Sequence, residues 1–314
     1  MGISVRPLLE GDLDSAGRVC RMAYGTFLGL ADPMKFMGDA SYVRTRWFAH
    51  PSAAFVAEVD GKLVGSNFVT NWGSVGLFGP LTVHPEMWDK GIAKRLLEPT
   101  MSLLEKWEIK HAGLFTSAHS PKHVGLYQKF GYWPRSLTSV MSKSVDRKVI
   151  TLKWSKYSEL TKDDRKDCLN ACRSLTNTIY RGLDLQWEIE SVNEQGLGDT
   201  VLIWNDDDSL EGLAVCHCGA GSEAGSGVCY IKFGAARAGP NSGQTFDHLV
   251  DSCEAFADSK GIPRLVAGVN VGRREAYRKM LTSGFRTYLQ GVAMHKPDEP
   301  GYNQPDIYVI DDWR

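Results

Sequence analysis

Residues 88–93, Trp-Asp-Lys-Gly-Ile-Ala, lie where a strand pattern gives way to a helix pattern. The first backbone N–H groups of a helix have no partner within the helix, and the helix dipole places partial positive charge at the same end. Gly91 and Ala93 have no large side chain to cover these groups. The segment is therefore a candidate pyrophosphate site, although an ordinary junction between a strand and a helix has the same spacing.

Two elements must position this candidate site. The apolar run from Val75 to Val83 has strand length and β-branched content, and Pro85 stops it because proline has no N–H for a sheet ladder. A helix is predicted to begin near Gly91. Its apolar positions recur at steps of three and four residues and so share one face: Ile92, Leu96, Thr100, Leu103, Leu104 and Trp107.

Length and charge limit the function classes. A chain of 314 residues with 43% hydrophobic content fits two domains. Its net formal charge of -1 gives no broad electrostatic surface for nucleic acid or an anionic membrane. No run approaches the roughly eighteen apolar residues of a membrane span, and residues 1–6 lack the apolar core of a signal peptide. We therefore expect a cytoplasmic protein that contacts neither nucleic acid nor membrane.

The seven cysteines are odd in number and scattered, which favours reduced thiols in the core over a disulfide framework. Cys168 and Cys172 lie one helical turn apart without a matching second pair. In the strand-like segment Cys216-His217-Cys218, the histidine faces away from both cysteines. Neither group has the spacing of a zinc site, so no metal is expected.

The order of predicted elements over residues 1 to about 145 recurs in the rest of the chain. Leu63-Val-Gly65 resembles Leu210-Glu-Gly212 at an offset of 147, and Gly131 corresponds to Gly284 at an offset of 153. Two landmarks in the same order indicate a duplicated domain. We assign residues 1–147 to an N-terminal domain and 148–314 to a C-terminal domain.

With these motifs in place, the chain resembles the GCN5-related N-acetyltransferase (GNAT) superfamily, as a tandem protein. The family's phosphate motif, Arg/Gln-x-x-Gly-x-Gly/Ala, is matched by residues 88–93, except that Trp88 stands where Arg or Gln is usual. A later signature, Leu-Tyr followed by a Gly-aromatic pair, is matched by Leu126-Tyr127 and Gly131-Tyr132. The resemblance implies an α/β (α+β) fold of two GNAT-like domains. Each would be a mixed, mostly antiparallel sheet flanked by helices, with a V-shaped gap between central strands.

The resemblance also implies acetyl-CoA as the co-substrate, bound in the gap. The pantetheine arm would pair with backbone groups of Leu81, Thr82 and Val83, and Leu81 N–H is a candidate donor to the oxyanion. Tyr127 resembles the family's general acid, which protonates the leaving thiolate, although a core aromatic residue has the same spacing. The remaining residues predicted to contact the cofactor are Trp88, Asp89, Lys90, Gly91, Ile92, Ala93, Lys94 and Ser120, of which Ser120 stands where the family commonly has Asn.

The acceptor amine must lose a proton, directly or through water. His119 is the first candidate for the base because it follows the strand predicted over 112–117 and because histidine is a residue type suited to accepting a proton near neutral pH. Glu86, Glu58 and His84 are the alternatives, and a loop histidine without chemistry is the plainer interpretation of His119. The acceptor is predicted to be a small-molecule amine.

The second copy lacks both motifs. Residues 234–243 contain no Gly-x-Gly/Ala opening of the helix predicted at about 245–257, and Met280 takes the tyrosine position. The C-terminal domain is therefore predicted to be degenerate and to have a structural or substrate-shaping role. Two alternatives remain open for the whole chain: a non-catalytic acyl-CoA-binding or sensor module, favoured if Trp88 blocks the phosphate turn, and an acyltransferase that uses another acyl-CoA.

Overall fold

The computed structural model describes residues 2–146 and 153–314. Residues 147–152, which include the predicted domain boundary, lie outside the described residues. In chain order, the first half contains β1 (Ile3–Pro7), η1 (Glu10–Asp12), α1 (Leu13–Phe27), η2 (Pro33–Lys35), α2 (Tyr42–Ala49), η3 (Pro51–Ala53), β2 (Ala54–Val59), β3 (Lys62–Trp72), β4 (Val75–Phe78), β5 (Thr82–Val83), η4 (Pro85–Met87), α3 (Ile92–Lys106), β6 (His111–Thr116), α4 (Pro121–Gln128) and β7 (Trp133–Ser144).

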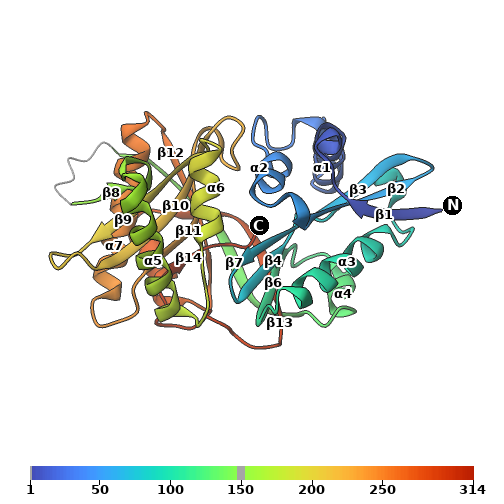
Figure 1. The fold of residues 1–314 in the computed structure, drawn as a ribbon. Helices are drawn as coiled ribbons and strands as arrows, with labels where there is room; N and C mark the ends of the chain where they lie inside the picture. Colours follow the sequence, from blue (N-terminus) through green and yellow to red (C-terminus); the bar gives the residue numbers. More distant parts are fainter. Residues whose placement is uncertain (1, 147–152) are drawn as a thin grey trace.

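The second half repeats this order of helices, antiparallel strands, helix, strand, helix and strand (Figure 1). It contains β8 (Ser155–Lys156), η5 (Tyr157–Glu159), α5 (Lys162–Ile179), α6 (Gln186–Glu194), β9 (Gly198–Trp204), β10 (Leu210–Gly219), β11 (Gly225–Ala236), α7 (Ser242–Ser259), β12 (Arg264–Asn270), α8 (Arg274–Thr282), β13 (Arg286–Lys296) and β14 (Val309–Ile310).

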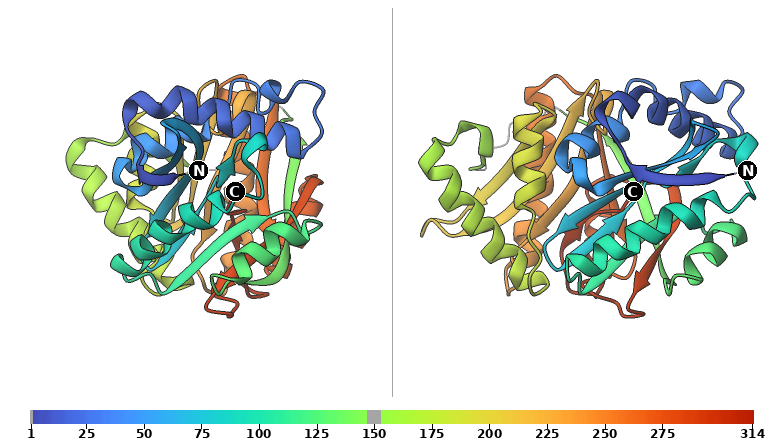
Figure 2. Two further views of the ribbon diagram at one scale, coloured as in Figure 1. Left: turned by 90° about the vertical axis from the view of Figure 1, so that its right-hand side faces the viewer. Right: turned by 45° about the vertical axis from the view of Figure 1, so that its right-hand side comes forward.

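Helices cover both faces of the sheet in each half (Figures 1 and 2). Successive strand residues point to opposite faces, and this alternation separates two apolar layers in the first half. Phe68 packs with Leu13 and Val43 from α1 and α2, whereas the next residue, Val69, packs in the core cluster that includes Leu97 of α3. In the second half, α5 and α6 cover one face and α7 covers the other.

The two halves exchange their last strands within one mixed sheet, which has fourteen strands among the described residues. Twelve of them follow the order β1-β2-β3-β4-β6-β13-β7-β12-β11-β10-β9-β8, while β5 pairs with β3 and β14 pairs with β11 beside this path. Strand β13 of the second half pairs with β6 of the first, and β7 of the first half pairs with β12 of the second. The predicted mixed, mostly antiparallel sheet flanked by helices is therefore confirmed, and the sheet runs unbroken from one half into the other.

The long strand predicted over 75–83 is wrong in one respect, because it is interrupted at Gly79 and Pro80. Strand β4 runs parallel to β6 only from Val75 opposite His111 to Leu77 opposite Gly113, whereas β6 continues to Thr116. After the interruption, β5 pairs with β3 instead. The interruption opens the predicted gap between the central strands.

Three further predictions, for a strand, a helix and the cysteines, can be compared with the structure. The predicted strand 112–117 begins one residue earlier, the helix predicted at about 245–257 is α7, and six of the seven unpaired cysteines are buried. Among the described residues, no helix is long and apolar enough to span a membrane.

Candidate active site

The phosphate turn (residues 88–93) enters α3 through left-handed backbone. Gly91 is the residue before the first turn of α3 and has a φ of 78°, a conformation that favours glycine. A Cβ placed on Gly91 would meet nothing within 4 Å, so the space above the turn is open. Ile92 is buried and anchors the helix, whereas Ala93 is half-buried. The turn therefore presents unpaired N–H groups at a helix N-terminus, the arrangement that binds phosphate groups.

Trp88 braces this turn against the neighbouring strand. Its indole N–H donates to the carbonyl of Val83 at 2.7 Å, and the ring packs in the apolar cluster that contains Val83 and Ile92. The Lys122 ammonium lies 5.6 Å from the centre of the Trp88 ring and pairs with Asp89 at 2.7 Å. Trp88 thus ties β5 to the turn and leaves the space over Gly91 open.

The basic residues near the turn are exposed. Lys90 donates to the carbonyl of Glu86 at 2.9 Å, whereas the Lys94 side chain lies on the exposed face of the first turn of α3. Glu86 itself is an exposed residue of η4, immediately before the phosphate turn.

Residues Leu81, Thr82 and Val83 form the wall of the gap opposite β6. Thr82 and Val83 are buried in β5, and the Thr82 hydroxyl contacts the Ser66 hydroxyl at 3.2 Å. The N–H of Gly79, just before this wall, donates to the carbonyl of Phe68 at 2.8 Å. The wall is thus held on β3 and leaves β6 without a β5 partner.

Tyr127 extends from α4 towards the place where β4 ends. Its ring lies 5.9 Å from that of Phe78, the last residue of β4, and its side chain is buried. Burial raises the pKa of the Tyr127 hydroxyl above its usual value. A tyrosine kept protonated in this way can donate a proton.

The remaining predicted residues lie in the loop that joins β6 to α4. Ser120 is the N-cap residue of α4, although its side chain makes no capping hydrogen bond. The Ser117 hydroxyl lies 3.0 Å from Nδ1 of His119, and the His119 ring stacks on Phe27 at 6.1 Å. Within the described part of the chain, no hydrogen bond joins His119 or Glu86 to Tyr127.

Residues 26–132 match the model of the acetyltransferase (GNAT) family. We refer to the first half of the chain, which contains this match, as the GNAT domain. This match spans the interrupted strand, the phosphate turn, β6 and α4, and so covers every predicted site residue.

Solved structures share the fold over nearly the whole chain. A putative acetyltransferase from Pyrococcus horikoshii has a TM-score of 0.70 at 13% identity, covering 99% of this chain and 95% of that one. A GCN5-related N-acetyltransferase from Sphaerobacter thermophilus has a TM-score of 0.61 at 15% identity, covering 94% and 95%. A glucosamine N-acetyltransferase region of a fungal β-N-acetylglucosaminidase has a TM-score of 0.64 at 11% identity, covering 94% and 38%. No curated protein sequence matches the chain.

The GNAT domain also contains a residue that sequence analysis did not single out. Arg46, on α2, is 9% exposed and donates to the carbonyl of Gly79 at 2.6 Å, next to the wall of the gap. Its carboxylate partner is Glu223 of the second half, 177 positions away in the chain. No local pattern marks such a pair, because each residue is an ordinary charged side chain until the fold joins them.

The second half closes the place that corresponds to the gap. Strands β11 and β12 pair in parallel up to Ile231 opposite Ala267, and β14 then pairs with Gly234 and Ala235 of β11. Strand β14 is confined to Val309–Ile310 and pairs with β11 beside the main path of the sheet. Both of its residues are fully buried.

The two motif positions of the second half also lack the groups found in the GNAT domain. Met280 is buried in α8 where Tyr127 stands in α4, and Tyr277 packs one turn earlier against the core. Asn241 precedes the first turn of α7 with a φ of -95°, so no left-handed glycine opens that helix.

Proposed function

We propose that the chain is an acetyl-CoA-dependent N-acetyltransferase whose active site lies in the GNAT domain, within residues 1–147. Residues 148–314 form a degenerate second GNAT-like domain that shapes the substrate side. The observation that carries this proposal is that the gap, the open phosphate turn and the buried Tyr127 occur together in the first half only. We place the protein in the cytoplasm.

The cofactor contacts follow from the geometry of the turn and the wall. Amides of the phosphate turn bind the pyrophosphate, with Trp88 as a brace and with Asp89, Lys90 and Lys94 around it. Backbone groups of Leu81, Thr82 and Val83 pair with the pantetheine arm, and Ser120 and Tyr127 flank the thioester end. These contacts need no metal.

The reaction is a direct transfer without an acyl-enzyme. The acceptor nitrogen attacks the thioester carbonyl, a C–N bond forms and the C–S bond breaks, while Leu81 N–H donates to the developing oxyanion. Tyr127 gives its proton to the departing thiolate. The proton lost by the amine passes to His119, directly or through water, with Glu86 as the alternative acceptor.

The acceptor is a primary amine of a small molecule. GNAT-family chemistry supports acetyl transfer to an amine in general, and the near-neutral charge of the chain gives no surface suited to a histone-like partner. A non-catalytic acyl-CoA sensor is the alternative, and the open space over Gly91 argues against the blocked turn that would favour it.

Release of free CoA separates an enzyme from a sensor. Purified protein is incubated with acetyl-CoA and a panel of amines that includes polyamines, amino acids and glucosamine, and free thiol is measured. We expect at least one amine to give turnover, and propionyl-CoA and succinyl-CoA in parallel assays test the acyl group. Thermal stabilisation by acetyl-CoA without CoA release from any amine would support the sensor instead.

Substitution of the proposed general acid tests the mechanism. Tyr127→Phe should lower kcat by roughly a hundredfold, as is usual for loss of a general acid, and should keep acetyl-CoA affinity. Tyr132→Phe is the matched control, because Tyr132 is a buried tyrosine of the same core cluster whose hydroxyl contacts only Met101 Sδ, at 3.6 Å, among the described residues. Equal kcat in the two variants would contradict the role of Tyr127.

A further inference from the structure

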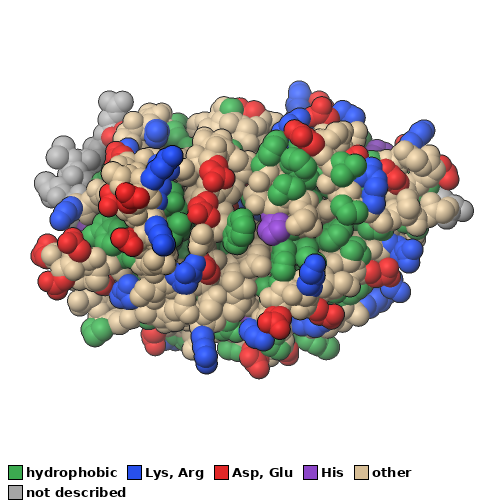
Figure 3. Space-filling view, in the orientation of Figure 1, with side chains coloured by type: hydrophobic (Ala, Val, Ile, Leu, Met, Phe, Trp, Pro, Cys, Tyr) green, Lys and Arg blue, Asp and Glu red, His purple; other side chains and the backbone are tan. Residues whose placement is uncertain are grey.

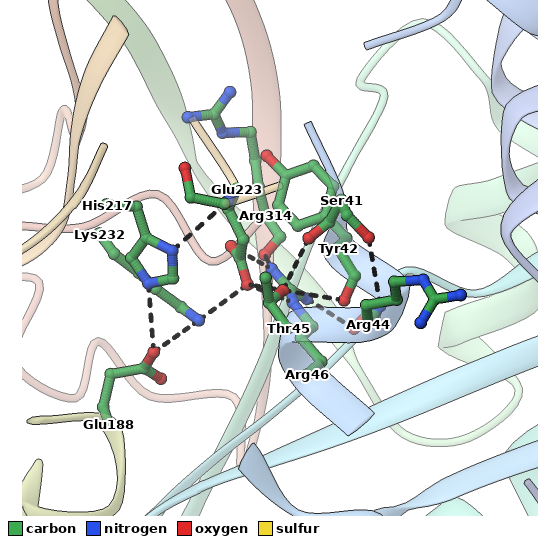
Figure 4. Close-up of polar contacts among 12 residues, drawn as sticks. Ser41, Tyr42, Arg44, Thr45, Arg46, Glu188, His217, Glu223, Lys232 and Arg314 are labelled. Atoms are coloured by element: carbon green, nitrogen blue, oxygen red, sulfur yellow. Dashed lines mark hydrogen bonds and ion pairs between the residues drawn. The ribbon is translucent and has the colours of Figure 1, made fainter. Parts of the chain in front are cut away.

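A buried ion pair joins the second half of the chain to the wall of the active-site gap. Arg46 Nε lies 3.0 Å from Glu223 Oε1, and Arg46 Nη2 lies 3.1 Å from Oε2 (Figure 4). Both side chains are almost wholly buried, at 7% and 0% exposed. A bidentate pair fixes the plane of the guanidinium group as well as its position.

The same guanidinium holds the peptide at which β4 is interrupted. Arg46 Nη1 donates to Gly79 O at 2.6 Å, while Gly79 N–H donates to Phe68 O on β3. Both backbone groups of Gly79 are therefore fixed, one by β3 and the other through Arg46 by Glu223. Leu81, the proposed oxyanion donor, follows two residues later.

Glu223 is held in turn by groups of the second half. Lys232 Nζ lies 2.9 Å from Glu223 Oε1 and 2.8 Å from Glu188 Oε1, and the backbone N–H of Glu223 donates to His217 Nδ1 at 3.4 Å. Burial alone would raise the pKa of Glu223, but the Arg46 and Lys232 cations outweigh it and hold that pKa below its usual range. The carboxylate is thus a charged, fully coordinated anchor.

The helix that carries Arg46 is attached to the same loop of the second half. Ser41 N–H, at the start of α2, donates to the carbonyl of Ser222 at 2.9 Å, and the Thr45 hydroxyl lies 3.4 Å from Glu223 Oε1. Gln195 donates to the carbonyl of Thr45 at 3.1 Å. In Figure 4, Glu223 lies between α2 on one side and Lys232 with Glu188 on the other.

We infer that Glu223 is a positioning residue for the GNAT active site: through Arg46 it fixes the Gly79 peptide and thereby the direction of Leu81 N–H. This inference rests on the proposed function, and it deepens the role of the second half from shaping a cleft to orienting a catalytic group. An oxyanion donor is effective only when it is fixed before the reaction, and a small misplacement can cost a large factor in rate.

Steady-state kinetics test the inference with three variants. Glu223→Gln keeps the shape of the anchor and removes its charge. Arg46→Lys keeps a cation beside Glu223, but one ammonium cannot reproduce both bonds to Glu223 and the bond to Gly79. Both should lower kcat at least about tenfold and change KM for acetyl-CoA less than about threefold, because the phosphate turn is untouched.

Glu254→Gln is the matched control. Glu254 is 1% exposed, pairs with Lys143 at 2.7 Å, and lies on α7, far along the chain from Gly79. Its substitution also breaks a buried ion pair, so it should lower the melting temperature by a similar amount and leave kcat unchanged. Unchanged kcat in a folded Arg46→Lys protein would overturn the inference, as would equal kcat losses in Glu223→Gln and Glu254→Gln.

Hydrogen exchange gives a readout that does not depend on turnover. In the full-length protein, the amides of Gly79 and of residues 81–83 should exchange at least about tenfold faster in Glu223→Gln and Arg46→Lys than in wild type or Glu254→Gln. If wild type releases no CoA with any amine, the proposed function fails while this exchange result still decides whether Glu223 fixes the peptide. If these amides exchange at the wild-type rate in both Glu223→Gln and Arg46→Lys, Glu223 does not position the Gly79 peptide.

Discussion

The two halves of the molecule differ in what lies beside their separated central strands. In each half a parallel pair of central strands separates part-way along, and the exposed backbone groups need a hydrogen-bond partner. In the GNAT domain the separated wall is β5, with an open phosphate turn beyond it. In the second half β14 of the same chain pairs with the corresponding backbone. Under the proposed function, the second half would have lost cofactor binding for a structural reason, because β14 pairs with the backbone that the cofactor would otherwise contact.

The largest expected difference between the halves is at the two helix N-termini. Ala93→Asp places a carboxylate in the phosphate turn and should weaken acetyl-CoA binding at least about a hundredfold through charge repulsion, although an acidic residue in a first helical turn is favourable for the helix itself. Gln244→Asp makes a comparable change in the first turn of α7 and should have no effect. Calorimetric titration with acetyl-CoA measures both, and an equal loss of affinity would break the comparison.

The filled gap should behave as core rather than as a site. Ile310→Ala removes a fully buried side chain from β14 and should lower the free energy of unfolding by about 2–4 kcal/mol. Acetyl-CoA affinity and stoichiometry should stay as in wild type, because the binding turn is in the other half. Urea denaturation and titration test the two statements, and a second equivalent of bound acetyl-CoA would show that the gap is latent instead.

The contact between the exchanged strand and the GNAT domain should be sensitive to acid. His111 on β6 and His295 on β13 are buried, with Nε2 of the first 3.1 Å from Nδ1 of the second. Burial lowers the pKa of each from 6.5 to about 4. Because the unfolded chain binds protons at higher pH than the native state, stability is full above pH 6.5 and falls as the pH drops to 4.

By pH 4 this loss should amount to roughly 3 kcal/mol for each of the two histidines. Unfolding measured by urea at a series of pH values should show it in wild type, and the double variant His111→Gln with His295→Gln should show a flatter profile over the same interval. Parallel profiles would mean that other groups cause the acid sensitivity.

The smallest effect on acetyl-CoA affinity is expected from substitution of Trp88, which braces the phosphate turn. Trp88→Phe keeps the apolar ring contact with Val83 but loses the indole hydrogen bond, worth about 1 kcal/mol. Acetyl-CoA affinity should fall by roughly two- to fivefold, since the turn retains its amides. Titration distinguishes this result from tighter binding, which would indicate that the indole obstructs the site.

Local patterns predicted the groups that depend on neighbouring residues. The helix start at Gly91, the strand before it and the loss of tyrosine at Met280 could be predicted because turn chemistry and periodicity act within a few positions. The interruption at Gly79 was not predicted, although Pro80 lacks the N–H of a sheet ladder just as Pro85 does and so gave a local signal for it. The new partner could not be predicted, because the pairing of β5 with β3 depends on the tertiary fold.

Long-range pairs could not be predicted from one sequence. Arg46 and Glu223 become special only when burial removes them from water, and nothing near either residue signals the other. The exchange of β7 and β13 could not be predicted either, because each strand has an ordinary pattern of apolar residues and the choice of neighbouring strand depends on the whole sheet.

The exchange of strands has a consequence for synthesis on the ribosome. Strand β6 gains its neighbour β13 only after residues up to Lys296 have been made, so a nascent first half carries an unfinished sheet edge while most of the second half is still being translated. Such an edge can pair with other chains. Vectorial folding of this protein therefore ends with both halves at once, and a gene encoding only the first half should yield chains that associate rather than fold alone.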